Sequence, residues 1–154
     1  MKIQETNWDC GACAVLNALR CYNDRISSKK VRKACNSDPQ KGTDEKDLVN
    51  GIAALGYVGH AFNHNKVGQA WEMLKENLSS GKPVILNVDK EQHWVTAIGI
   101  INDHVIIFDS NNTIKNLAEN GIHVLSKRVL GKRWKDDAGN FYGVAVAEIT
   151  IDKK

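Results

Sequence analysis

The sequence contains no long hydrophobic run. Its most apolar stretch lies around Val95–Ile101, far short of the roughly 18 residues needed to cross a bilayer. The first residues, Met1 to Glu5, also lack the apolar segment of a secretory signal. We therefore expect no membrane partner and a cytoplasmic protein, in a compartment that keeps thiols reduced.

Proline is also scarce, with two residues in 154, and the chain shows no repeat, linker or low-complexity tract. A length of 154 residues with 42% hydrophobic composition suits one domain, residues 1–154. The net charge of +3 comes without any nucleic-acid-binding signature. We expect no nucleic-acid partner, and the composition leaves the oligomeric state open.

The chain has four cysteines, all in its first quarter. A disulfide scaffold is normally shorter, secreted and more evenly cross-linked. Cys13, Cys21 and Cys35 are therefore expected to be small buried residues.

Helical patterns dominate the first half of the chain and strand patterns the second. The pattern predicts helices at 10–22, 27–35 and 66–78 and, more weakly, at 122–133. A further helix is expected to follow Thr43 as its N-cap and to end at Leu55. It predicts strands at 58–62, 83–88, 93–101, 104–109 and 142–151. This segregation indicates an α+β fold with an antiparallel sheet, and the first helix, apolar nearly all round, is expected to be buried against one sheet face.

Cys10 stands at the predicted start of that buried helix, after Asp9 as a plausible N-cap and before Gly11, which leaves the approach to the sulfur open. Backbone N–H groups and the helix dipole at this position stabilise a thiolate. Such a position suits a nucleophilic cysteine, and it also suits a redox cysteine.

Three further residues complete a candidate acyl-transfer site. Gln4, six residues upstream of Cys10, can supply a side-chain N–H to an oxyanion. His93, at the start of an apolar strand, can act as the general base. Asp109, at the end of the next strand, can orient the imidazole.

The pairing of the two strands decides whether His93 and Asp109 meet. A two-residue turn at Asn102-Asp103 would leave Asp109 on the opposite face of the sheet from His93. A one-residue shift brings them to one face, so we expect a β-bulge or a longer effective loop.

Together these positions resemble the papain-like cysteine peptidases, and among them the C39-type domains that process bacteriocin precursors at a double-glycine leader. Gln4, then Asp9-Cys10-Gly11, and His93 with Asp109 sixteen residues later are similar to the two halves of that family's motif. Val129–Trp134 and the sequence Tyr142-Gly143-Val144-Ala145 resemble its closing segment. Two residues depart from the pattern: Ser110 stands where proline is common, and Cys13 where small residues are usual.

The resemblance implies a papain-like fold and a cysteine peptidase without cofactor or metal, acting on a protein or peptide substrate. It implies Cys10 as nucleophile, His93 as base, Asp109 as orienting group and Gln4 in the oxyanion hole. Hydrolysis of a peptide or isopeptide bond would then pass through a thioester acyl-enzyme, with a small residue such as glycine before the cleaved bond.

Four other readings stay open. Cys10 and Cys13 form a C-x-x-C pair like that of a thiol redox protein. The cysteines could bind zinc with His60 and His64, although Cys21 and Cys35 are not a close pair. The same triad supports deamidation or transglutamination. A catalytically idle binding module is the fourth, with a docking face at Lys127-Arg128, Lys132-Arg133 and Lys135.

Overall fold

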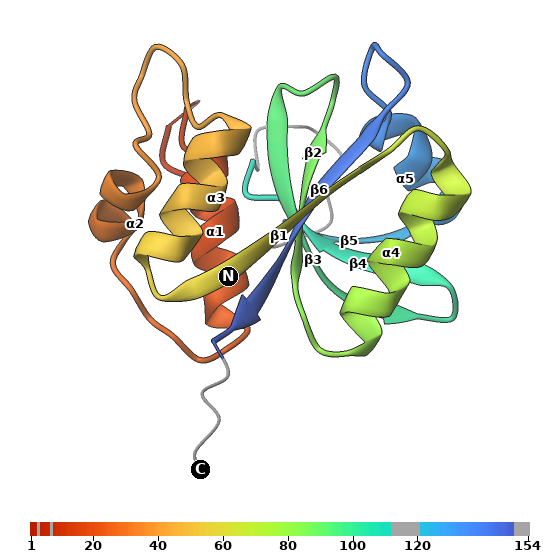
Figure 1. The fold of residues 1–154 in the computed structure, drawn as a ribbon, viewed down its shortest axis with the longest axis horizontal. Coiled ribbons are helices and arrows are strands. Elements are labelled where there is room, and N and C mark those ends of the chain that lie inside the picture. The colour runs from red at the N-terminus through yellow and green to blue at the C-terminus, as the bar shows by residue number, and fades with distance from the viewer. Residues whose placement is uncertain (3, 7, 112–120, 150–154) are drawn as a thin grey trace.

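A six-stranded antiparallel sheet forms the centre of the protein (Figure 1). The computed structural model describes residues 1–2, 4–6, 8–111 and 121–149. Along the chain the strands are β1 Tyr57–His64, β2 Val84–Val88, β3 His93–Ile101, β4 His104–Phe108, β5 Ile122–Ser126 and β6 Phe141–Glu148. Their order across the sheet is β1-β6-β2-β3-β4-β5, and every neighbouring pair is antiparallel. The α+β class with an antiparallel sheet is thus confirmed.

Helices cover both faces of this sheet. They are α1 Cys10–Arg20, α2 Ser28–Ala34, α3 Glu45–Ala54, α4 Val67–Ser79 and α5 Lys127–Trp134. In Figure 1, α1, α2 and α3 gather on one side of the strands, and α4 and α5 on the other. Within the described residues, no helix is long and apolar enough to span a membrane.

The alternation of side chains along β2 divides the interior into two cores. Ile85 packs with α1, α2 and α3, whereas Val84, Leu86 and Val88 pack with α4 and α5. Because both faces are covered, all five residues of β2 are buried. This explains why four of the five residues of β2 are apolar, on both faces of the strand, with Asn87 as the exception.

Helix α1 is the buried helix that its composition predicted. Every residue from Cys10 to Leu19 is buried, and the hydroxyl of Thr96 on β3 donates to the Ala14 carbonyl at 2.9 Å. This cross-link and the surrounding apolar contacts set the position of the helix start relative to β3, and therefore the position of Cys10.

The predicted helix at 122–133 is wrong in its first part. Residues Ile122–Ser126 form β5, which pairs with β4 from Phe108↔Ile122 to His104↔Ser126. The β-branched Ile122 and Val124 favour a strand once a partner edge is present. Helix α5 begins only afterwards, with Ser126 as its N-cap accepting from the Val129 N–H. The predicted strand at 142–151 ends at Glu148, and positions 150–151 lie outside the described residues.

One predicted helix cap is wrong, and a second occupies the predicted position without a capping bond. Asp44, rather than Thr43, caps α3 and accepts from the Asp47 N–H at 2.8 Å, while the Thr43 hydroxyl is bonded to Ser37. Asp9 precedes α1, but its side chain makes no capping bond because Arg32 binds its carboxylate. In both cases another side chain binds the group that was expected to cap the helix, and only Arg32 lies far from its partner in the sequence.

The contact between α2 and α3 requires glycine at position 51. A Cβ at Gly51 would lie 2.6 Å from the Cys35 sulfur and 2.8 Å from its Cα. We expect Gly51→Ala to lower the free energy of unfolding by about 1–3 kcal/mol, as overpacking does. Gly68→Ala on α4, with nothing within 4 Å, should change it by less than about 1 kcal/mol. Equal denaturant midpoints for the two variants would contradict this packing.

Candidate active site

A β-bulge brings His93 and Asp109 together. The turn has two residues, Asn102 and Asp103, both with positive φ (48° and 58°), as a tight hairpin requires. The pairing then shifts by one residue between Ala97 and Gly99. The expected bulge is therefore confirmed, and the His93 Nε2 atom lies 2.6 Å from Asp109 Oδ1.

This pair is buried, and each member changes the ionisation of the other. Burial opposes the charged imidazole, but hydrogen bonds to Asp109 and to Cys10 outweigh it and raise the pKa of His93 to about 9. Burial likewise opposes the carboxylate, yet the hydrogen bond from His93 holds the pKa of Asp109 below its usual value. The arrangement thus favours an imidazolium beside a carboxylate.

Cys10 lies on the other side of His93. Its interaction with the imidazole is one of the hydrogen bonds that raise the pKa of His93. Because Asp109 takes Nε2, the ring nitrogen that can face the sulfur is Nδ1. The structure therefore brings Cys10, His93 and Asp109 together from α1, β3 and the end of β4, as the sequence predicted.

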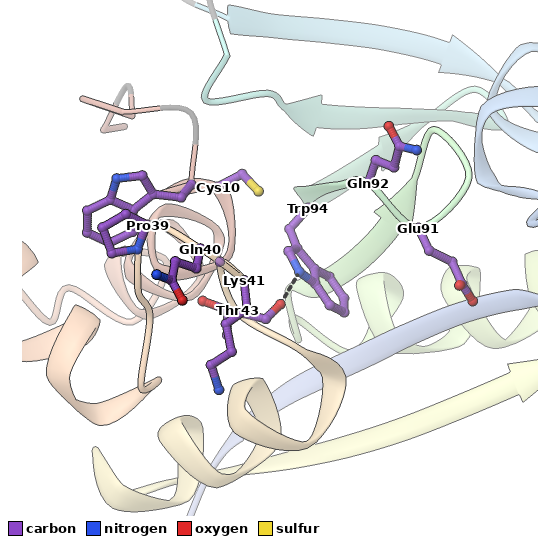
Figure 2. Close-up of a pocket in the computed structure, with 10 residues that line it drawn as sticks. Cys10, Pro39, Gln40, Lys41, Thr43, Glu91, Gln92 and Trp94 are labelled. Carbon is purple, nitrogen blue, oxygen red and sulfur yellow. Dashed lines mark hydrogen bonds between the residues drawn. The ribbon is translucent and has the colours of Figure 1, made fainter.

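A hollow of about 460 Å³ opens at Cys10. In Figure 2 the sulfur points from the start of α1 toward β3, and Lys41 and Thr43 form a facing wall. The Trp94 indole N–H donates to the Thr43 carbonyl at 2.9 Å and ties that wall to β3. Trp8 also lines the hollow.

Gly11 was expected to leave the approach to the Cys10 sulfur open, and the structure gives it a packing role as well. A Cβ at this position would lie 2.6 Å from Thr43 Cβ and 3.2 Å from the Trp94 ring. Glycine therefore allows the segment before α3 to pack directly on the start of α1, which closes one side of the hollow next to Cys10.

Gln4 is held by the segment that carries Asp109. Its N–H donates to the Ser110 carbonyl at 3.0 Å, and its Oε1 accepts from the Ser110 hydroxyl at 2.8 Å. Its side-chain amide donates one bond, to the Thr6 carbonyl at 2.8 Å. An amide NH₂ has two hydrogens, so this bond does not exhaust it. Ser110, a departure from the resembled motif, thus serves to orient Gln4.

Arg133 on α5 links two parts of the site. It donates to Asp109 Oδ2 at 3.3 Å and forms a two-pronged bond with Asp89, at 3.1 and 2.9 Å. Asp89 begins a run of three residues with φ between 55° and 65°, ending at Glu91. These left-handed conformations are unfavourable, and Arg133 helps to hold the turn that leads into His93.

Arg32 on α2 supports the other wall. Its guanidinium binds the buried Asp9 carboxylate and Glu5 and lies 5.8 Å from the centre of the Trp8 ring. A positive charge over the face of an indole ring is attracted by the π electrons of the ring. Arg32 therefore connects the residue before Cys10 with the aromatic lining of the hollow.

Sequence reasoning missed these supporting residues. Arg133 was grouped with the basic stretch around it, because nothing in the sequence separates it from Lys132. The same holds for Arg32, Ser110 and Thr43, whose partners at the site lie far away in the sequence. A single sequence does not show which distant residues will meet.

The redox reading finds little support. Burial and the neighbouring Asp9 raise the pKa of the Cys13 thiol to about 12, and burial raises that of Cys35 to about 12. Thiols with such values are poor nucleophiles near neutrality. Among the described residues, no group of three or more His, Cys, Asp or Glu side chains is arranged to hold a metal ion.

Comparisons with known proteins agree with this geometry. The family model of the Peptidase_C39 like family matches residues 1–141. No curated protein sequence matches the chain. The family match defines the class of the protein as a cysteine peptidase of the C39 type. The chain belongs to the Peptidase_C39 like family.

Solved structures share the fold across nearly the whole chain. The peptidase domain of Streptococcus ComA, a bi-functional ABC transporter involved in a quorum-sensing pathway, is 18% identical with a TM-score of 0.74, covering 96% of this chain and 97% of that one. A double-glycine-motif protease from an AMS/PCAT transporter, solved with its leader peptide, is 16% identical with a TM-score of 0.73, covering 96% and 89%. The Streptococcus mutans ComA peptidase domain is 19% identical with a TM-score of 0.66, covering 96% and 98%.

The charge state of His93 can be measured directly. We expect the imidazole to titrate near pH 9 by NMR, and Asp109→Asn to lower that pKa by about 1–3 units. Since the folded-state pKa exceeds the ordinary value of 6.5, its contribution to stability is complete below about pH 6.5 and is lost as the pH rises through 9.

Asp103→Asn, in the exposed turn, removes the same charge on the same hairpin and should leave the His93 titration unchanged. An Asp109→Asn protein whose His93 still titrates near pH 9 would show that the carboxylate does not control the imidazole.

Proposed function

We propose that this protein hydrolyses a peptide bond through Cys10, His93 and Asp109, with Gln4 in the oxyanion hole, and that the bond follows a glycine or another small residue. The observation that carries the proposal is the 2.6 Å contact between His93 and Asp109, with Cys10 near enough to help raise the pKa of the same imidazole. A thiol, a base and a group that orients the base are the parts that acyl transfer needs.

The chemistry would begin with a Cys10 thiolate beside the His93 imidazolium. The thiolate attacks the scissile carbonyl, and the oxyanion that forms is stabilised by the Cys10 backbone N–H and the Gln4 amide. His93 then gives its proton to the leaving amine, which departs and leaves a thioester on Cys10. Water, deprotonated by His93, attacks the thioester, and the sulfur leaves as a thiolate, which restores the pair of thiolate and imidazolium.

A comparison supports a small residue before the cleaved bond. One similar structure is a double-glycine-motif protease in complex with its leader peptide. We therefore propose a peptide with a Gly-Gly sequence as the substrate class. A nucleophilic thiol needs reducing conditions, so a cytoplasmic location remains part of the proposal.

The cleavage can be tested in cells and with purified protein. Comparing protein termini in cells that carry wild-type or Cys10→Ala protein, we expect new termini after glycine only with the wild type, because the variant lacks the nucleophile. Cys21→Ala, which removes an exposed thiol, should leave the cleavage intact.

Identical termini with and without Cys10 would overturn the peptidase proposal and leave deamidation, transglutamination or binding. Labelling with iodoacetamide separates these readings, because acyl chemistry of any kind requires Cys10 to react much faster than the buried Cys35. Equal labelling rates would indicate an idle binding module.

Arg133 is a positioning residue in this proposal, because it acts through Asp109 and the turn at Asp89. Arg133→Met should lower kcat about tenfold, the loss that one misplaced supporting group causes. It should also move the alkaline limb of the pH–rate profile to higher pH, because loss of the positive charge beside Asp109 strengthens the attraction of that carboxylate for the His93 imidazolium. Lys132→Met removes the adjacent positive charge and should alter neither. A lower kcat with an unshifted pH profile would assign Arg133 a purely structural role.

A further inference from the structure

The hollow at Cys10 continues into a second one of about 420 Å³. The two share Lys41, Thr43, Glu91 and Trp94 as lining residues. Figure 2 shows Glu91 on the turn before β3, Lys41 and Thr43 on the opposite side, and the Trp94 ring between them. A peptide held at Cys10 would therefore pass this second hollow, which nothing in the proposed chemistry uses.

Two carboxylates from separate segments line it, Glu45 at the start of α3 and Glu91 in the turn between β2 and β3. Asp136, which follows α5, adds a negative charge that acts on both. Burial and the neighbouring Asp136 raise the pKa of both glutamates. Like charges this close are unfavourable unless a proton or a cation lies between them.

An unpartnered amide lies at the floor of the same hollow. Asn87 on β2 lines it and is 5% exposed. Its Oδ1 atom is buried and has no hydrogen-bond partner among the described residues. A buried acceptor without a donor is costly, so this oxygen indicates a ligand that brings N–H groups.

The positive side chains nearby do not neutralise the cluster. Lys41 is bonded to Asp47, which lies outside the hollow, at 2.7 Å, and Lys90 lies 3.9 Å from Asp137. Lys46, which is exposed, is the other ammonium group in the lining. Asp44 also lines the hollow and adds a further negative charge.

The geometry excludes one obvious cation. In the part of the chain that the structure describes, no three acidic, His or Cys side chains are close enough together to hold a metal ion. Carboxylates that are too widely spread for a metal still suit an extended organic cation, whose several N–H donors reach separate acceptors.

We propose that this second hollow is a subsite for an arginine or lysine side chain of the peptide substrate, bound by Glu45, Glu91 and the amide oxygen of Asn87. The inference rests on the proposed peptidase function, and it adds that the substrate carries a basic residue near its Gly-Gly sequence. A planar guanidinium, with five donors in a fork, fits these acceptors better than an ammonium.

Binding to the Cys10→Ala protein tests the subsite without catalysis. The probes are Gly-Gly peptides with one arginine placed in turn at each of four positions on either side of the Gly-Gly sequence. Each is matched by the same peptide with citrulline, the uncharged analogue of arginine. Calorimetry should show about tenfold tighter binding of the arginine peptide at one position, as expected for a charge-assisted pair.

A charge-removing substitution in the protein tests which residues form the subsite. In the Cys10→Ala background, Glu91→Gln should reduce the arginine-to-citrulline ratio to near one. Glu72→Gln, on α4 away from this hollow, should keep the ratio. Far-ultraviolet circular dichroism and the denaturation midpoint show whether each variant is folded.

Equal affinities for arginine and citrulline at every position would overturn the subsite, as would a preference that survives Glu91→Gln in a folded protein. Wild-type cleavage of the same peptides reports separately on the proposed function. A protein that binds arginine peptides selectively but cleaves none would retain the subsite and lose the peptidase proposal.

Discussion

The contact between His93 and Asp109 is the interaction on which the rest of the site depends. Asp109 is fully buried, and a buried carboxylate is tolerated only when it is paired and hydrogen-bonded. His93 and Arg133 take one oxygen each, and the Asn111 N–H donates to the oxygen that His93 occupies. The Asp109 N–H bonds to the Gly121 carbonyl at 2.9 Å. Side chains from β3 and α5 thus meet at one carboxylate, and Gly121 holds the backbone that carries it.

Two departures from regular sheet geometry make this convergence possible. The bulge between Ala97 and Gly99 changes which residues of β3 and β4 lie together, and the left-handed run Asp89–Glu91 directs the chain into His93. Irregular backbone of this kind persists where surrounding contacts hold it. Arg133 supplies such contacts to the turn, through Asp89, and to the Asp109 carboxylate that the bulge aligns with His93.

The sequence predicted the elements that have strong local signals. The buried helix, the strands of the β3–β4 hairpin and the bulge needed to align His93 with Asp109 all agree with the structure. The failures lie where other partners compete with local preference. Arg32 removes Asp9 from its capping role, Ser37 does the same to Thr43, and the free edge of β4 turns Ile122–Ser126 into a strand. The roles of Gln4, Cys10, His93 and Asp109 in catalysis remain predictions.

By itself the sequence determined the class of the protein, its apolar periodicities and the chemical identity of the residues at its site, because these depend on residue type and short spacing. Only the tertiary structure decided which charged groups meet. Ion pairs such as Arg133 with Asp109 and clusters such as Glu45 with Glu91 join residues at least 24 positions apart. Their partners follow from sheet register and helix packing, in which a shift of one residue exchanges the faces of a strand.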